Sequence, residues 1–412
     1  MADPKNPGQF GNRKDTLEQA SKGGRASTGS FGRPNAADPH EAGRKGCTGT
    51  ADGGRAEGRP AQPRRQLASR RTASVGSVAR SRASNITREP GYAPDMVNFG
   101  YFLASEQYGP KELVEQAKRA EQAGFERLWI SDHFHPWNDA EGQSPFVWGT
   151  IGALSEATDL PVTTAVTCPT VRIHPVIIAQ AAATAAVQLD GKFILGVGSG
   201  EALNEHILGN PWPSPAVRLE MLEEAIQLIR RLHRGGTINH RGQYYTVQDA
   251  RIYTLPDAPV PIYISGFAPR ATQLAARIGD GFCTVLPDAD AVDAFRTEGG
   301  GAKPVQAGAK VSWSRDEESG LDAAHRLWAN ELLPGQLSQT LPRPRDFEDA
   351  MSLVDRESTR NHFATGPDPE RHIRQLRQYL DAGVDELYVQ QIGPDLDGFF
   401  TAWEKEIQPA LS

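Results

Sequence analysis

The chain has 412 residues, 38% of them hydrophobic and 23% charged, which is enough for a large core and more than one domain. The net charge of −7 is unevenly spread, because residues 1–95 hold 17 Lys and Arg against 9 Asp and Glu, whereas the remainder holds 27 against 42. The acidic remainder argues against a nucleic-acid groove, and no apolar run reaches the ~18 residues of a membrane span. The widely spaced cysteines Cys47, Cys168 and Cys283 predict a reducing, cytoplasmic location without a disulfide framework.

Residues 1–92 are predicted to form a disordered extension, separate from a folded domain over 93–412. The extension is rich in Gly, Ser, Ala and Arg, so it offers little apolar surface to offset the entropy of ordering. It contains a short internal repeat of Phe-Gly and Lys-Gly pairs: Phe10-Gly11 with Lys22-Gly23, and Phe31-Gly32 with Lys45-Gly46. The repeat resembles those of glycine-lysine-rich bacterial stress proteins. Met96 is compatible with a shorter product that starts there.

The folded part alternates apolar, strand-like runs with amphipathic helical stretches over about 315 residues. The eight predicted strands are 97–103, 126–132, 161–168, 193–199, 260–265, 281–286, 308–314 and 385–391. The predicted helices lie near 110–124, 146–158, 175–189, 217–234, 269–278, 317–330, 369–383 and 395–410. This alternation predicts an α/β fold, a (β/α)8 TIM barrel with parallel strands. Two inserts are expected, a hairpin at 235–258 and a second segment at 331–362.

Polar side chains follow the predicted strands, and in such a barrel the carboxyl ends of the strands meet at one rim that carries the catalytic groups. These strand-end residues are Asp132 and His133, Thr167 and Cys168, the run Ser199, Gly200, Glu201 with Asn204 a turn later, Ser265 and Gly266, and Thr284. The convergence of His, Glu, Asp and Asn on one rim is typical of an acid–base site.

His133 is the best acid–base candidate because an imidazole titrates near neutral pH. A lone loop histidine would more often be structural, but the other polar strand ends favour a functional role. Glu201 has an alternative interpretation as a carboxylate stabilised at a helix start, and Gly198 and Gly200 fit a simple tight turn as well as close approach to a ligand. Trp137 fits loop packing and a wall over a flat ring equally well.

His133 and His135 also form an H-x-H pair, which can ligate zinc in metal-dependent hydrolases. Such a site needs further ligands from later strands, and neither His nor Asp stands at the ends of strands five, six and eight. The sequence therefore favours an acid–base site without a metal.

Five motifs carry a family resemblance: Ser105-Glu106-Gln107, Ser131-Asp132-His133-Phe134-x-Pro136-Trp137, Thr167-Cys168-Pro169-Thr170, His174-Pro175-x-x-x-Ala179-Gln180, and the run from Leu195 to Glu205. Together they resemble the bacterial luciferase-like oxidoreductases, and within these the deazaflavin-dependent glucose-6-phosphate dehydrogenase group. The resemblance covers 97–410 and does not extend to the first 92 residues.

The resemblance implies coenzyme F420, a hydride carrier without the oxygen chemistry of a flavin, on the C-terminal face of the barrel. It also implies a non-proline cis peptide at Ala165-Val166. The implied cofactor-binding residues are Asp132, Val166, Cys168, Ser199, Gly200, Asn204, Ser265 and Gly266. The implied catalytic residues are His133, which takes the proton of an alcohol, Glu201, which serves the ring nitrogen, and the active-site Trp137. The base and acid assignments can be reversed if the enzyme acts as a reductase.

The substrate side departs from the sugar-phosphate enzymes, which place lysines after strand six and in the late insert. Asp288 and the region of Leu337 occupy those positions here, and only Arg360 or His362 remains for a phosphate. A carboxylate in place of a phosphate-binding lysine would repel a dianion. We therefore expect a neutral alcohol, or the corresponding ketone or aldehyde, as the small-molecule partner instead of glucose 6-phosphate.

Two other functions stay open. The same fold could serve as an FMN-dependent, luciferase-like monooxygenase, although the Trp137 loop and the run from Gly198 to Asn204 count against it. Alternatively, the chain could act mainly as a hydrophilic stress protein in which the extension dominates. By resemblance, the barrel is expected to form a homodimer.

Overall fold

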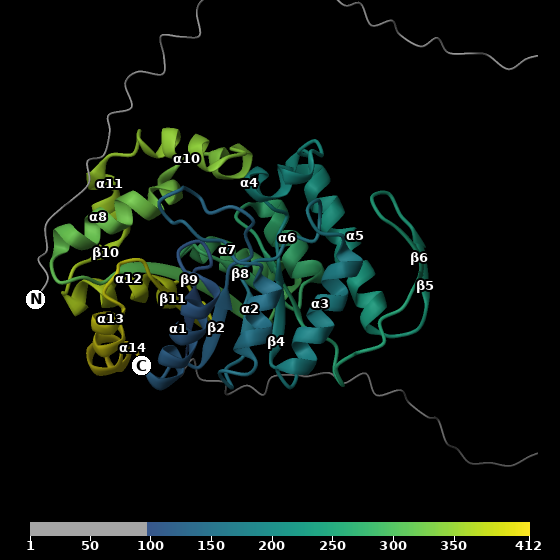
Figure 1. Cartoon of the computed structure of the whole chain (residues 1–412), viewed down its shortest axis with the longest axis horizontal. Coiled ribbons are helices and arrows are strands. Elements are labelled where there is room, and N and C mark those ends of the chain that lie inside the picture. Colours follow the sequence, from purple (N-terminus) through teal and green to yellow (C-terminus); the bar gives the residue numbers. More distant parts are fainter. Residues whose placement is uncertain (1–96) are drawn as a thin grey trace, which may run out of the picture. The chain divides into compact units, whose positions relative to one another are not determined.

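The computed structural model describes residues 97–412, and Figure 1 shows how their helices and strands are arranged. The predicted extension over 1–92, its repeat and Cys47 lie outside the described residues. In the described part, none of the helices is both long and apolar enough to cross a membrane.

Eight parallel strands close into a barrel, which confirms the predicted fold. The strands are β1 (Asn98–Leu103), β2 (Arg127–Ile130), β3 (Val162–Thr164), β4 (Phe193–Val197), β7 (Ile262–Ser265), β8 (Gly281–Thr284), β9 (Val305–Ser312) and β11 (Glu386–Gln391). Each strand pairs with the next one in this order, and β11 pairs back with β1, so the sheet closes on itself. The strands are mostly buried, as expected for a parallel sheet that is filled inside and covered outside.

Helices surround the barrel between the strands (Figure 1). They are α1 (Pro110–Gln122), α2 (Val147–Leu154), α3 (Pro175–Gln188), α5 (Pro215–His233), α6 (Pro269–Ile278), α7 (Ala289–Phe295), α8 (Glu317–Trp328), α12 (Pro369–Asp381) and α13 (Leu396–Ala402). Local signals define their ends, as α5 illustrates. Ser214 accepts a hydrogen bond from the amide of Val217, Pro215 follows at the first position, and Arg230 and Arg231 lie in the last turn.

The sequence pattern does not predict one of these helices. Helix α7 lies between β8 and β9, and a π-helical turn (Arg296–Gly300) follows it. Only Val292 and Phe295 of α7 are buried, so its apolar period is too short to stand out in the sequence. Asp288 begins the helix, because its carboxylate accepts a hydrogen bond from the amide of Ala291 at 3.0 Å.

Both inserts extend the barrel. The 235–258 insert holds the predicted hairpin, made of the antiparallel strands β5 (Ile238–Arg241) and β6 (Thr246–Ala250). The 331–362 insert is helical, with α9 (Leu337–Thr340), α10 (Pro344–Met351) and α11 (Arg356–His362), and the short β10 (Ala364–Thr365) then pairs with β9. Phe347 of α10 packs against Trp137 with 5.2 Å between the ring centroids. The second insert therefore reaches the loop that follows β2.

Aromatic side chains fill the barrel interior. Trp129 stacks on Tyr388 with 4.6 Å between the ring centroids, and its indole N–H donates to Gln306 at 2.9 Å. Gln306 in turn donates to Glu386 at 2.7 Å, so the polar atoms in this layer are paired. Trp129 and Phe102 line the cavity described next, which makes this layer its floor.

Candidate active site

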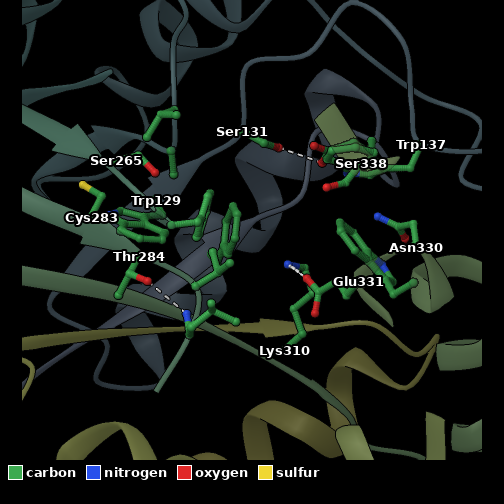
Figure 2. A pocket seen from close by; sticks show the side chains of 18 of the residues that line it. Trp129, Ser131, Trp137, Ser265, Cys283, Thr284, Lys310, Asn330, Glu331 and Ser338 are labelled. Atoms are coloured by element: carbon green, nitrogen blue, oxygen red, sulfur yellow. Dashed lines mark hydrogen bonds and ion pairs between the residues drawn. The ribbon is translucent and has the colours of Figure 1, made fainter. Parts of the chain in front are cut away.

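A cavity of about 300 Å³ opens at the carboxyl ends of the barrel strands (Figure 2). Side chains from the strand ends and from the interior of β9 line it: Ser131, Ser265, Thr284 and Lys310. The segment from α8 to α11 contributes a second set: Trp328, Asn330, Glu331, Ser338 and His362. This volume is within the range of small-molecule sites, and its wall combines segments that are far apart in sequence.

Three titratable side chains, Glu106, His133 and Glu201, form one end of the cavity, which we call the proton end. His133 Nδ1 lies 3.4 Å from Glu106 and 3.3 Å from the carbonyl oxygen of His135, and Ser131 Oγ donates to Glu106 at 2.7 Å. Because both neighbours of Nδ1 are acceptors, the neutral ring carries its proton on Nδ1 and leaves Nε2 unprotonated. Nε2 lies 3.8 Å from Glu201, which is beyond hydrogen-bond distance. His133 and Glu201 can therefore serve different atoms of a bound ligand.

Asn204 connects the two sides of the proton end. Its side-chain oxygen accepts from the amides of Phe134 and His135 at 2.7 and 2.9 Å, and its amide nitrogen donates to Glu201. Asn204 lies on the short helix α4 (Ala202–Glu205), which begins directly after Glu201. It therefore ties the loop after β2 to the loop after β4 and holds His133 near Glu201.

Trp137 stands beside the proton end. Its ring centroid lies 5.0 Å from that of His133 and 5.2 Å from that of Phe347, and its backbone amide donates to Glu141 at 2.7 Å. Trp137 thus packs within its loop and also lines the cavity, and its role as a wall over a flat ring stays a prediction.

A buried ion-pair network lies behind the proton end. Arg172 is 2.8 Å from Asp132 and 3.5 Å from Glu205, and Thr167 Oγ1 donates to Asp132 at 2.7 Å. Burial raises the pKa of Glu205 to about 7, although backbone hydrogen bonds and the charge of Arg172 oppose that shift. Burial also raises the pKa of the Cys168 thiol, which therefore stays neutral. These side chains support the site from inside the protein.

The structure brings five of the sequence-predicted site residues to the cavity wall: His133, Trp137, Val166, Glu201 and Ser265. Six others lie outside the lining: Asp132, Cys168, Ser199, Gly200, Asn204 and Gly266. Asp132, Cys168 and Asn204 are buried, whereas Ser199 and Gly200 are partly exposed at the end of β4. Their roles in cofactor binding stay predictions. The cis peptide at Ala165-Val166 is confirmed, and both of its residues line the cavity.

Lys310, Asn330, Glu331 and His362 form the other end of the cavity, which we call the recognition end, and of these four the sequence pattern singles out only His362. Lys310 forms an ion pair with Glu331, and its ammonium lies 4.4 Å from the ring centroid of Trp328. His362 Nε2 lies 3.3 Å from Glu331. Figure 2 shows Lys310, Glu331 and Asn330 grouped on one side of the cavity. The sequence holds a signal for Lys310, because a lysine within a buried parallel strand needs a partner.

The Lys310–Glu331 pair carries no net charge at neutral pH. Burial alone would raise the pKa of Glu331, but the charge of Lys310 and the contact with His362 outweigh burial and lower that pKa to about 2. Glu331 is therefore a carboxylate that cancels the ammonium charge.

The described residues include no group of three or more His, Cys, Asp or Glu side chains placed to hold a metal ion. The two histidines of the H-x-H pair engage different partners. His133 lies between Glu106 and Glu201, whereas His135 Nδ1 lies 2.9 Å from the carbonyl oxygen of Leu203. The pair does not converge on one point.

A parallel (β/α)8 barrel with titratable side chains at the carboxyl ends of its strands defines a class of α/β-barrel proteins, and comparisons with known proteins identify the family. Residues 97–386 match the model of the family described as luciferase-like monooxygenase, and the chain belongs to this family. Its relatives include two proteins named F420-dependent glucose-6-phosphate dehydrogenase. The one from Amycolatopsis mediterranei is 36% identical over 334 residues, which cover 77% of this chain and 99% of the relative. The one from Microbacterium testaceum is 35% identical over 330 residues, which cover 76% and 97%.

Solved structures show the same fold. An F420-dependent secondary alcohol dehydrogenase, in complex with an F420-acetone adduct, superposes with a TM-score of 0.71 at 30% identity and covers 77% of this chain and 99% of its own. The coenzyme F420-dependent tetrahydromethanopterin reductase from Methanopyrus kandleri superposes with a TM-score of 0.62 at 21% identity and covers 77% and 99%. At that identity, the second likeness concerns the fold alone.

Proposed function

We propose that this chain is a coenzyme F420-dependent oxidoreductase that transfers a hydride between an alcohol or carbonyl substrate and the deazaflavin. The observation that carries the proposal is the position of His133, whose Nδ1 faces two acceptors while its ring lines the cavity. Two acceptors, Glu106 and the carbonyl oxygen of His135, fix its proton on Nδ1, so that Nε2 can receive a proton at the cavity wall. The F420-dependent relatives support the choice of cofactor.

The cavity suits a flat, heteroatom-rich ring. Phe102, Trp129 and Val166 provide an apolar surface, and the hydroxyl groups of Ser265 and Thr284 stand at the strand ends, where they can pair with ring heteroatoms. When bound, F420 supplies a ring carbon that takes or gives a hydride. Val166 and Ser265 would hold the ring, and the turn with Ser199 and Gly200 would hold the tail. Asp132, Cys168, Asn204 and Gly266 would act from behind as positioning residues.

The two proton tasks fall to different residues of this chain. In the oxidation direction, His133 Nε2 accepts the hydroxyl proton of the alcohol, and Glu106 stabilises the imidazolium that results. Glu201, at the same end of the cavity and 3.8 Å from Nε2, holds or moves a second proton. In the reduction direction the same groups exchange roles, so that His133 donates the proton to the carbonyl oxygen.

The substrate in this proposal is neutral. A sugar phosphate is disfavoured by the pairing of Lys310 with Glu331 instead of by repulsion from Asp288. Asp288 does not line the cavity, because its carboxylate caps α7, so direct repulsion of a phosphate is the wrong explanation. Arg360 is also outside the lining and is paired with Glu317 and Glu318. Among the described residues that line the cavity, Lys310 is the only lysine or arginine, and it is paired with Glu331.

Titration of the full chain with coenzyme F420 and, separately, with FMN tests the cofactor. We expect tight binding of F420 and at least tenfold weaker binding of FMN. A screen of secondary alcohols and ketones, followed by the absorbance of the deazaflavin, then tests the reaction. Selective binding of FMN would overturn the proposal in favour of a flavin-dependent monooxygenase.

We also infer that the barrel pairs with a second copy through α2 and α3. An apolar groove between these helices is lined by Phe146, Trp148 and Ile177, and Phe146 and Ile177 are 62% and 54% exposed. Light scattering of the full chain and of the Phe146→Glu variant measures whether each one pairs with a second copy. A wild-type monomer would contradict the inference.

A further inference from the structure

The recognition end of the cavity carries a cation whose charge is already cancelled. Within residues 97–412, Lys310 is the only Lys or Arg that lines the cavity, and it is 7% exposed. Its ammonium is enclosed by the carboxylate of Glu331 and by the rings of Phe102 and Trp328, at 5.5 and 4.4 Å. Glu331 therefore decides whether this end of the cavity attracts anions.

Asn330, next to Glu331, contributes a buried amide. Its side chain is 4% exposed and lines the cavity, and its oxygen has no hydrogen-bond partner in the described residues. Natural folds pair nearly all of their buried polar groups. The Asn330 oxygen is buried behind the wall, whereas its amide nitrogen is not among the buried unpaired atoms, so this amide has pairing capacity left for a ligand. Because the oxygen and nitrogen of an amide exchange places when the group rotates, Asn330 can present an acceptor or a donor.

The wall between the two ends is largely apolar. Trp137, Phe267, Val285 and Leu286 line it, and Phe267 and Leu286 are 55% and 42% exposed. A ligand that extends from His133 to Asn330 would therefore meet carbon-rich surface along its middle and polar groups at both ends.

We propose that Glu331 and Asn330 select an uncharged substrate that carries a second hydroxyl or carbonyl group besides the one that reacts. Glu331 cancels the charge with which Lys310 would attract a phosphate or carboxylate, and Asn330 pairs with the second polar group. This inference rests on the proposed function, because it assumes that the reacting group lies at His133.

Anion binding to the full chain tests the role of Glu331. Inorganic phosphate and glucose 6-phosphate are titrated by calorimetry into wild type, Glu331→Gln and Asp288→Asn. We expect no measurable binding to wild type and at least a tenfold gain in affinity for Glu331→Gln, because its Lys310 is uncompensated. Asp288→Asn removes an equal charge outside the cavity lining and should show no gain. Phosphate binding by wild type, or a folded Glu331→Gln without a gain, would overturn the proposal.

A matched pair of alcohols tests the role of Asn330. Cyclohexanol and trans-1,4-cyclohexanediol differ by one hydroxyl group, and both are compared by kcat/KM with F420 and by calorimetric binding. Wild type should prefer the diol by about tenfold, as one additional hydrogen bond provides. Asn330→Leu should lose that preference, so that its kcat/KM values for the two alcohols become about equal. An unchanged preference in Asn330→Leu would overturn the role of Asn330.

The two experiments separate this inference from the proposed function. If neither alcohol is turned over with F420, the proposed function fails. The phosphate titration requires no turnover, and its result still supports or overturns the role assigned to Glu331.

Discussion

The two ends of the cavity are built in different ways. The proton end places Glu106, His133 and Glu201 directly after barrel strands, on loops that short hydrogen bonds hold in place. The recognition end combines Lys310, from the interior of β9, with Asn330 and Glu331, from the segment after α8. The first end carries groups that can exchange protons, whereas the second end carries charges that cancel each other.

This difference suggests a division of work. The chemistry that members of a barrel family share belongs on the strand ends, where the rigid scaffold fixes geometry to within a fraction of an ångström. Selection among substrates belongs on an insert, which can change without disturbing the barrel. The predictions below are ordered by the size of the expected effect, and each one tests this division.

Removing the imidazole of His133, the proposed base at the proton end, should have the largest effect. We expect His133→Ala to lower kcat by about 10²–10⁴, because the hydroxyl proton loses its acceptor, while the Kd for F420 changes little. Glu201→Gln should likewise lower turnover more than cofactor affinity. The matched control is His135→Gln, since His135 is a neighbouring histidine whose ring contacts Leu203 instead of Glu106. Normal turnover by His133→Ala would show that another group is the base.

Breaking the ion pair at the recognition end should destabilise the fold. Lys310→Met leaves the carboxylate of Glu331 without its main partner, and we expect a loss of about 3 kcal/mol in the free energy of unfolding. The double variant Lys310→Met, Glu331→Gln should recover most of that loss, because no charge is then left unpaired. Denaturant unfolding measures both variants. Equal stability of the single variant and wild type would mean that the pair is well solvated.

The two ends should contribute to the free energy of unfolding with opposite dependence on pH. Burial raises the pKa of Glu205, behind the proton end, from 4.5 to about 7, so its stabilising contribution is present below pH 4.5 and is lost as the pH rises through 7. The pKa of Glu331 is lowered from 4.5 to about 2, so its contribution is present above pH 4.5 and is lost as the pH falls towards 2.

Unfolding free energies measured across pH check both signs. Between pH 5 and 8, the free energy of unfolding of wild type should fall by about 2 kcal/mol more than that of the Glu205→Gln variant. Between pH 5 and 2.5, the free energy of unfolding of wild type should fall by a similar amount more than that of the Glu331→Gln variant. Parallel pH profiles of a variant and wild type would contradict the corresponding assignment.

The smallest effect is expected at Asp288, which sits near the cavity in sequence but caps α7 in the structure. Asp288→Ala should reduce the free energy of unfolding by about 1 kcal/mol, as the loss of a helix cap does, and leave substrate preference unchanged. Ser214→Ala, which removes the cap of α5, provides a matched control. A change in substrate preference would place Asp288 at the cavity after all.

Much of the site near the barrel strands could be predicted from the sequence. Strands and helices have distinct apolar periods, and polar residues directly after a strand must lie at the rim, which is why His133 and Glu201 are found without a structure. The same reasoning does not predict on which side Asp132, Cys168 and Asn204 lie, because position after a strand does not say whether a side chain faces the cavity or the protein interior. Here Arg172 and the loop after β2 engage Asp132 and Asn204 from behind.

The sequence by itself determined the barrel, its inserts and the position of His133 and Glu201 after barrel strands, because these depend on the apolar periods of strands and helices and on which residues follow each strand. Only the tertiary structure shows which residues form the recognition end and that their charges are paired. Lys310 and Glu331 meet because the segment after α8 folds back over β9, and the charge of Lys310 is cancelled by that contact alone. Asp288 shows the reverse case, since its local role at the start of α7 removes it from the cavity wall. Charge balance in a cavity is a property of side chains brought together in space, and no local pattern in the chain reports it.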